Sequence, residues 1–309
     1  MTKKFRFGVQ TSGAKSGDAW REKARKIEDL GFSTLLIPDH FNEQYAPMPA
    51  MVSAAEATTT LRVSGLVLDN DYKHPLVLAK EIATLDVLSG GRVDLGLGAG
   101  WMETDYTASG IPYDRPGVRI SRFHEGLKII KGLLSDEPVD FKGTYYTITN
   151  HSGTPKPVQK PVPVLIGGGG KRVLSIAARE ADIISVNYNL APGAVNQTVM
   201  KTGDATSTEE KIRWIREAAG SRFDEIELSV TVFVAIVTDD RAGMAERMGG
   251  GMGMAPEEVL KSPHTLIGTT DQIVDALQES RERFGFSYIA ISGDRFEALA
   301  PVVKKLAGT

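Results

Sequence analysis

The 309-residue sequence contains no cysteine. Disulfide bonds and thiolate metal sites are therefore excluded, and the absence fits a cytoplasmic protein. The sequence also lacks any apolar run near the roughly 20 residues that a membrane-spanning helix needs. Its first residues, 1–8, contain no apolar segment of the kind that marks a secretory signal. We expect a cytoplasmic protein without a membrane partner.

The chain has little excess charge of either sign. Its 36 Lys and Arg against 39 Asp and Glu give a formal net charge of -3. Nucleic acid is not expected as a partner, because phosphate neutralisation needs a dense basic surface. The five histidines are scattered, and no Glu-x-x-His or His-x-x-x-His pair occurs, so no metal site is predicted.

Short β-rich runs alternate with helical patterns along the whole chain. The eight expected strands are 5–10, 34–38, 62–68, 92–98, 163–166, 181–186, 228–237 and 287–291. Eight strands with a helix after each are typical of an α/β protein whose parallel strands close into a (β/α)8 TIM barrel. No linker divides the sequence, so we expect a single domain over 1–309.

Such a barrel takes about 250 residues, which leaves roughly 60 for insertions. We expect insertions after strands 4, 6 and 7, at 136–160, 187–208 and 241–265. The third contains the run Met-Gly-Gly-Gly-Met-Gly-Met at 248–254. Its many glycines and lack of branched side chains favour a disordered surface loop, with a mobile lid as the alternative.

Polar and glycine residues accumulate after the expected strands. These residues are Gln10, Asp39, His40, Asp69, Asn70, the segment 98–101, the segment 167–170 and Asn187. Catalytic residues of a (β/α)8 barrel lie at the carboxyl ends of its strands. The pattern predicts one wide site that takes a large planar ligand.

Four consecutive glycines, 167–170, precede Lys171, Arg172 and a helix. Glycines let backbone N–H groups approach an anion, and a helix N-terminus adds a favourable dipole. We interpret the run as a phosphate site, with a flexible turn as the alternative. It is not a Walker A loop, because no Gly-Lys-Ser/Thr follows at the required spacing.

The segment 96–100, Gly-Leu-Gly-Ala-Gly, matches part of a dinucleotide fingerprint, but Trp101 replaces the last glycine. The segment also lacks the first-strand βαβ context, so a Rossmann fold is rejected. Its small residues leave room for a flat ring system. Trp101 either lines that cavity or belongs to the core.

Asp39 and His40 end the second expected strand. A histidine exchanges protons near neutral pH, so His40 is the candidate for acid–base catalysis, with a structural or solvated role as the alternative. Neighbouring side chains at a strand end point in different directions. Asp39 is therefore expected to bind the cofactor and need not orient His40.

Several segments together resemble the bacterial luciferase-like monooxygenase superfamily. They are 37–40 (Ile-Pro-Asp-His), His74-Pro75, 88–93, 96–101, 115–125, 167–172 and 266–269. The similarity runs from about residue 5 to 303. Members are (β/α)8 barrels, commonly homodimers, that bind FMN or the deazaflavin coenzyme F420. The Pro-Asp-His strand end is more similar to the F420-dependent oxidoreductases.

The resemblance also implies where the cofactor binds. It implies contacts at Asp39, Gly65, Leu66, Gly98, Ala99, Gly100, Gly167, Gly168, Gly169, Gly170 and Lys171. It further implies a non-prolyl cis peptide near Gly65-Leu66, at a bulge that presses on the ring. One departure is at 10–13 (Gln-Thr-Ser-Gly), which lacks the acidic residue of sugar-phosphate dehydrogenases in this branch and puts glucose 6-phosphate in doubt.

Three functions are compatible with these residues. The first is F420-dependent hydride transfer to or from a small organic substrate, with His40 carrying the proton. The second is an FMN-dependent monooxygenase, which needs reduced flavin and oxygen. The third is a flavin-binding protein without turnover. The protein supplies positioning and acid–base groups in the first two cases, and the cofactor supplies the redox chemistry.

Overall fold

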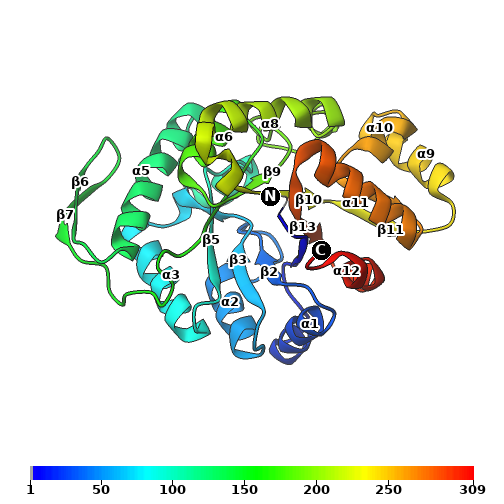
Figure 1. Ribbon diagram of the computed structural model, residues 1–309. Coiled ribbons are helices and arrows are strands. Elements are labelled where there is room, and N and C mark those ends of the chain that lie inside the picture. Colours follow the sequence, from blue (N-terminus) through cyan, green and yellow to red (C-terminus); the bar gives the residue numbers. More distant parts are fainter. Residues whose placement is uncertain (1–2) are drawn as a thin grey trace.

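Parallel strands close into a barrel in the computed structural model, which describes residues 3–309 (Figure 1). The barrel strands are β1 (Arg6–Gln10), β2 (Thr34–Ile37), β3 (Arg62–Gly65), β5 (Val93–Gly98), β8 (Val164–Gly168), β9 (Ile183–Val186), β10 (Glu227–Val232) and β13 (Phe286–Ser292). They lie in the order β3-β2-β1-β13-β10-β9-β8-β5, and pairing of β3 with β5 closes the ring. The predicted (β/α)8 fold is confirmed.

Helices cover the outside of the barrel (Figure 1). They are α1 (Gly17–Asp29), α2 (Pro47–Glu56), α3 (Pro75–Ser89), α4 (Glu103–Ser109), α5 (Pro116–Leu134), α6 (Lys171–Glu180), α7 (Gln197–Lys201), α8 (Ala205–Ala219), α9 (Arg241–Met252), α10 (Pro256–Lys261), α11 (Thr270–Phe284) and α12 (Ala300–Leu306), with 3-10 turns η1 (Asn70–Tyr72), η2 (Gly220–Glu225) and η3 (Phe296–Leu299). The Ser16 side chain caps α1 by accepting from the Ala19 N–H. None of the helices in residues 3–309 has the length and apolar character required to cross a bilayer.

The third strand is interrupted where the sequence predicted a continuous one. β3 ends at Gly65, and the chain resumes as β4 (Leu68–Asp69), which pairs with β5. The peptide bond Leu66-Val67 between them is cis. The predicted non-prolyl cis bond therefore exists, but one residue later than Gly65-Leu66.

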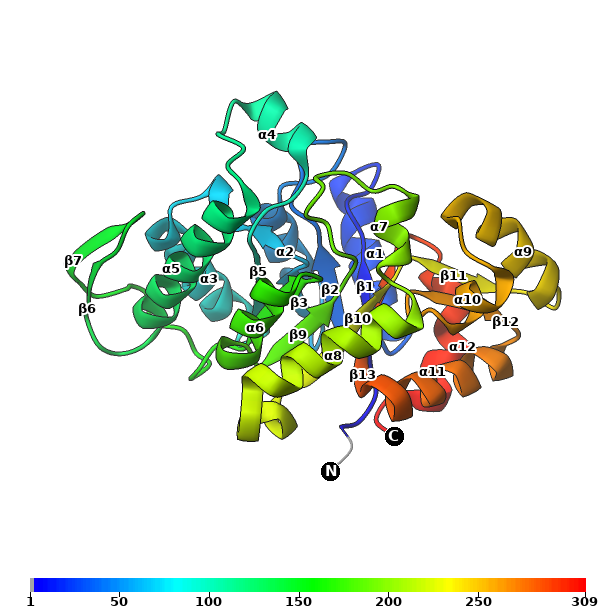
Figure 2. The same cartoon turned by 90° about the horizontal axis from the view of Figure 1, so that it is seen from above.

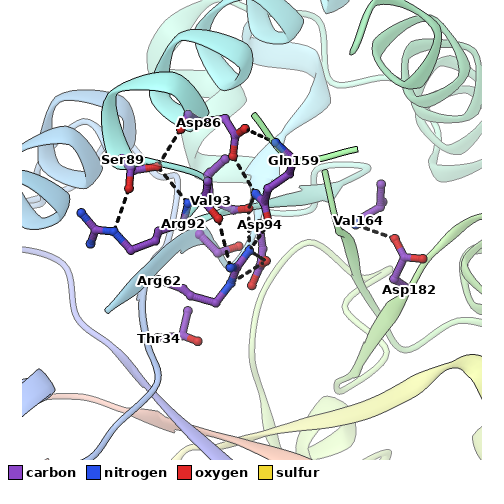
Figure 3. A network of polar contacts seen from close by, with 12 residues as sticks. Thr34, Arg62, Asp86, Ser89, Arg92, Val93, Asp94, Gln159, Val164 and Asp182 are labelled. Atoms are coloured by element: carbon purple, nitrogen blue, oxygen red, sulfur yellow. Dashed lines mark hydrogen bonds and ion pairs between the residues drawn. The ribbon is translucent and has the colours of Figure 1, made fainter. Parts of the chain in front are cut away.

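A polar network occupies the amino-terminal end of the barrel (Figure 3). Asp94 of β5 accepts from Nε and Nη2 of Arg62, at 3.0 and 2.5 Å. Arg92 donates to the carbonyl oxygens of Leu61 and Ala55, which ties the start of β5 to the segment before β3. These contacts lie at the end of the barrel opposite the expected site, where polar residues serve stability.

The seventh strand leaves the barrel, which the sequence did not predict. β10 ends at Val232, and β11 (Val234–Val237) pairs instead with β12 (Thr265–Gly268) in a separate two-stranded sheet. Phe233 lies at the break, and its N–H donates to the His264 carbonyl oxygen. The break turns the chain away from the barrel axis.

The Gly/Met-rich segment 248–254 is helical over most of its length, so the prediction of a disordered loop is wrong. It forms the end of α9, and Met252 and Met254 are buried with Val259 and Ile267. Long, flexible methionine side chains fill this satellite core. None of the segment's residues lines the main cavity.

The other insertions form local elements on the barrel surface. The first contains the antiparallel hairpin of β6 (Val139–Lys142) and β7 (Thr147–His151). The hairpin and α9 protrude from opposite sides of the molecule (Figure 1). In Figure 2, α4 and α7 lie at the end of the barrel opposite the C-terminus. That end holds the carboxyl termini of the strands.

Candidate active site

A cavity of about 340 Å³ opens at the carboxyl ends of the strands. Its lining includes all but one of the predicted site residues: Asp39, His40, Leu66, Gly98, Ala99, Gly100, Gly167, Gly168, Gly169, Gly170 and Lys171. The exception is Gly65, which is buried behind the wall, where an added Cβ would lie 2.5 Å from the Leu68 side chain. Segments far apart in the sequence therefore meet in one cavity.

The floor of the cavity is apolar. Leu66 and Val67 pack against the interior cluster of the barrel from the third-strand break. A Cβ at Gly98 would overlap the Val67 side chain, and one at Gly167 would lie 3.0 Å from it. Glycine at these two positions leaves room for the Val67 side chain.

His40 is held by a carboxylate from another element. Its Nδ1 lies 2.7 Å from Oδ2 of Asp105, a buried residue of α4. Asp105 also accepts from the Phe41 N–H at 3.2 Å and from the Tyr72 hydroxyl at 3.1 Å. Because a carboxylate only accepts hydrogen bonds, Nδ1 carries a proton in this arrangement.

The other ring nitrogen of His40 has no hydrogen-bond partner among residues 3–309. The Trp101 ring packs edge-on against the imidazole, with 5.6 Å between ring centroids. Both side chains line the cavity. Nε2 is therefore the nitrogen of His40 that is available to a ligand.

The Asp39 side chain makes no hydrogen bond to His40. Its Oδ2 accepts from the Asp69 N–H at 3.1 Å, which ties the end of β2 to the end of β4. Burial raises the pKa of the Asp39 carboxyl above its ordinary value. Asp39 offers the cavity a carboxyl whose other oxygen is available to a donor.

The four-glycine run shapes the turn between β8 and α6. A Cβ at Gly169 would overlap the carbonyl oxygens of Asn187 and Tyr188, and one at Gly168 would lie 2.5 Å from Val173. Gly170 is the N-cap of α6 and provides no side-chain cap. The first-turn N–H groups of α6 are therefore left for another acceptor.

The two cations after the glycine run differ in their environment. Arg172 donates to the Gly117 carbonyl oxygen and to the Ser121 hydroxyl, at 2.7 and 2.8 Å, which joins α6 to α5. Lys171 is exposed and has no carboxylate partner in the described part of the chain. Lys171 is thus the cation that remains available at this end of the cavity.

Helix α8 and the third insertion support the far wall. Lys211 of α8 is buried, and its Nζ donates to the Asn187 carbonyl oxygen at 2.8 Å. Burial lowers the pKa of Lys211 to about 8. His264 is fully buried against the rings of Tyr188 and Phe233, which line the cavity. The wall therefore depends on contacts between distant segments.

Sequence patterns did not identify Asp105. It lies in a short helix 65 residues after His40, and an acidic residue there is unremarkable by spacing. Arg119 was also missed: it lines the cavity from α5, yet it is only 2% exposed and donates to the Gly100 carbonyl oxygen. Only the fold brings these residues to the site.

Comparisons with known proteins agree with the fold. The F420-dependent glucose-6-phosphate dehydrogenase of Amycolatopsis mediterranei is 33% identical over 169 residues, which are 52% of this chain and 50% of that enzyme. The FMNH2-dependent dimethylsulfone monooxygenase of Pseudomonas putida is 28% identical over 180 residues, 56% of this chain and 49% of that enzyme. The chain thus spans about half the length of these curated relatives.

A solved structure shares the fold over the whole chain. The coenzyme F420-dependent tetrahydromethanopterin reductase of Methanopyrus kandleri superposes with a TM-score of 0.77 at 20% identity, covering 98% of this chain and 99% of that one. The family model described as luciferase-like monooxygenase matches residues 2–255. The match covers most of the chain, and the chain belongs to the luciferase-like monooxygenase family of enzymes.

Proposed function

We propose that this protein is an oxidoreductase that uses coenzyme F420 for hydride transfer to or from a small organic substrate. The observation that carries the proposal is the His40–Asp105 pair beside the apolar floor of Leu66 and Val67. The same cavity ends in a helix N-terminus suited to a phosphate. A ligand that carries both a planar ring and a phosphate fits the apolar floor at one end of the cavity and the helix N-terminus at the other.

The ring would lie on the Leu66–Val67 floor. Residues 98–100 line the cavity without large side chains, which leaves space for a planar system. Asp39 is the group that would hydrogen-bond the ring edge, because its carboxyl lines the cavity. Gly65 is proposed to act indirectly: because it has no side chain, Leu68 can pack in the space that a Cβ at position 65 would occupy.

The phosphate would bind at the start of α6. The glycine run and Lys171 line the cavity, α6 has no side-chain cap at its N-terminus, and the helix dipole favours an anion there by about 0.3–1 kcal/mol. The Lys171 ammonium, 5.9 Å from the centre of the Trp214 ring, adds a positive charge. These groups would hold the ribityl phosphate that F420 and FMN share.

His40 would move the proton. When bound, the deazaflavin supplies or accepts the hydride. His40 would then exchange a proton through Nε2 with the oxygen of the substrate, while Asp105 keeps Nδ1 protonated and fixes the ring orientation. The Leu66–Val67 floor and Trp101 would exclude water from one side of the reacting atoms.

Two alternatives use the same cavity. An FMN-dependent monooxygenase is favoured by the dimethylsulfone monooxygenase relative, since FMN offers the same ring and phosphate arrangement. A flavin-binding protein without turnover needs the cavity but not the His40–Asp105 pair. The pair therefore argues for an enzyme over a binder.

Fluorescence titration with oxidised and reduced F420 against FMN tests the proposal. We expect micromolar or tighter binding of F420 and weaker binding of FMN. Preference for FMN would reject the deazaflavin and favour a monooxygenase, and binding of neither would reject the cofactor site. His40→Ala is expected to abolish turnover and retain binding, whereas His151→Ala, on the exposed hairpin, should leave both unchanged.

The substrate is expected to differ from glucose 6-phosphate. Gln10 lines the cavity at the end of β1 with a neutral amide, which donates to the Leu66 carbonyl oxygen at 3.0 Å. Position 10 therefore lacks the acidic side chain of the sugar-phosphate dehydrogenases.

A single domain, a homodimer and a cytoplasmic location stay predictions. Light scattering on the purified protein tests the dimer.

A further inference from the structure

The Tyr106 hydroxyl lies between two carboxyl groups beside the cavity. Its oxygen is 3.1 Å from Oδ2 of Asp69 and 3.0 Å from Oδ2 of Asp71. A phenol has one proton and can donate it to only one of these oxygens. Burial and the two carboxyls raise the pKa of Tyr106, so the phenol keeps that proton.

Asp71 is the carboxylate that accepts the hydrogen bond of the Tyr106 hydroxyl. Arg122 holds Asp71 with two hydrogen bonds, from Nε to Oδ1 at 2.7 Å and from Nη2 to Oδ2 at 2.8 Å. A two-pronged contact with guanidinium stabilises the ionised form of a carboxyl. The single phenolic proton is therefore directed at Asp71.

Asp69 has no such cation. Within residues 3–309, no Lys, Arg or His nitrogen lies within 4.0 Å of its carboxyl oxygens. It is 7% exposed, and Oδ1 accepts the Asp71 N–H at 2.9 Å. Two further acids face it: Asp71 from η1 and Asp39 from the loop after β2. If Asp69 were ionised, Oδ2 would face the phenol oxygen without a proton between them.

We propose that Asp69 is a protonated, neutral residue of the cavity wall below neutral pH, and that its proton determines the affinity for anionic ring cofactors. The proton lies on Oδ2 and is donated to the Tyr106 oxygen, which in turn donates to Asp71. The recognition part rests on the proposed function, because it assumes a phosphate-bearing ring ligand.

The position of Asp69 connects its charge to the ligand. Asp69 pairs with Gly98 in the register of β4 and β5, and both line the cavity. Gly100 adopts φ +70, and a Cβ there would lie 2.6 Å from Oδ2 of Asp69. Burial raises the pKa of Asp69 to about 7. The wall therefore gains a negative charge beside the proposed ring site as the pH rises through neutrality.

Carbon-13 NMR of aspartate carboxyls in the ligand-free protein tests the protonation directly. We expect one carboxyl signal to titrate near neutral pH, to be absent from Asp69→Asn and to persist in Asp39→Asn. Triple-resonance assignment of Asp69 in the wild-type protein gives the same answer if a variant does not fold. An Asp69 carboxyl that is already ionised at pH 6 would overturn the inference.

Fluorescence titrations with F420 and FMN between pH 5.5 and 8.5 test the recognition. Wild-type affinity should fall roughly tenfold across neutral pH, the effect of one charge at about 10 Å in a medium of effective dielectric near 20. Asp69→Asn should lose this step. His40→Ala should keep it, which separates the effect from histidine titration.

The outcomes separate this inference from the proposed function. If neither cofactor binds, the proposed function fails, and the NMR titration alone decides whether Asp69 is protonated. If F420 binds with an affinity that is independent of pH, the proposed function stands and the recognition role of Asp69 is overturned. If the wild-type affinity falls across neutral pH and the Asp69→Asn affinity does not, the proposed function and the recognition role of Asp69 are both supported.

Discussion

His40 and Asp105 form a hydrogen-bonded pair across 65 residues of sequence, with 2.7 Å between Nδ1 and Oδ2. Asp105 accepts from three groups at once, His40, Tyr72 and the Phe41 N–H. It thereby fixes both the orientation of the imidazole and the nitrogen that faces the cavity. Asp105 is a positioning residue in this arrangement, because it holds His40 and does not itself line the cavity.

Replacing Asp105 with Asn tests this positioning. The asparagine amide has only one acceptor oxygen. It cannot accept hydrogen bonds from His40 and Tyr72 and also retain the one from the Phe41 N–H, so the tautomer of His40 is no longer fixed. We expect kcat to fall by about 10²-fold with little change in cofactor affinity. The acid limb of the kcat–pH profile should also shift. An unchanged kcat and profile would show that His40 carries no proton in the reaction.

The glycine run offers a matched pair of substitutions. Gly169→Ala places a Cβ against the backbone oxygens of Asn187 and Tyr188, whereas Gly170→Ala meets only Asn189 Oδ1 at 3.7 Å, an ordinary contact. We expect Gly169→Ala to weaken FMN and F420 binding at least tenfold by displacing the turn, as measured by fluorescence titration. Gly170→Ala should weaken it less. Equal affinities of both variants and wild type would place the phosphate elsewhere.

The sequence predicted the barrel because the alternation of strand and helix patterns is a local property. Ser16 caps α1 and His74 caps α3, and each lies directly before its helix in the sequence. The site residues at strand ends followed from the barrel, since the carboxyl ends of parallel strands meet at one face. Local chemistry and one topological rule thus account for this part of the structure.

The remaining features depend on contacts between distant segments. Asp105 reaches His40 only because α4 folds back over the barrel mouth. The exit of β11 from the barrel depends on its pairing with β12, about 30 residues later. Segment 248–254 is helical despite its glycines because Met252 and Met254 bury against β12 and α10. Tertiary packing overrides the low helix propensity of glycine there.

The buried His264 predicts sensitivity to acid. Burial lowers its pKa to about 3, while the unfolded chain binds the proton near pH 6.5. Between these values the unfolded state binds more protons, so the free energy of unfolding falls as the pH falls, by about 1.4 kcal/mol per unit from this group. Urea unfolding at pH 7 and pH 5 measures the loss.

His264→Phe provides the comparison. Nδ1 bonds the Thr231 carbonyl oxygen at 2.8 Å, and its loss should cost about 1 kcal/mol at pH 7. Phenylalanine cannot bind a proton, and it retains packing against Tyr188 and Phe233. The variant should therefore lose less stability between pH 7 and 5 than wild type. Parallel losses in both proteins would assign the acid sensitivity to other groups.

Two adjacent glycines of α9 should respond oppositely to alanine. Gly250 is exposed within the helix, and a Cβ there meets no atom within 4 Å. Gly250→Ala should raise the free energy of unfolding by about 0.5–1 kcal/mol, because alanine has the higher helix propensity. Gly249 is buried, and a Cβ there would lie 2.6 Å from the Met254 carbonyl oxygen.

Gly249→Ala should therefore lower the free energy of unfolding, since the turn after α9 must shift to admit the methyl group. Urea unfolding of the two variants and the wild type measures both effects. Because neither residue lines the cavity, cofactor affinity should be unchanged in Gly250→Ala. A stabilised Gly249→Ala, or a neutral Gly250→Ala, would mean that 248–254 is not a packed helix in solution and would restore the lid as the alternative.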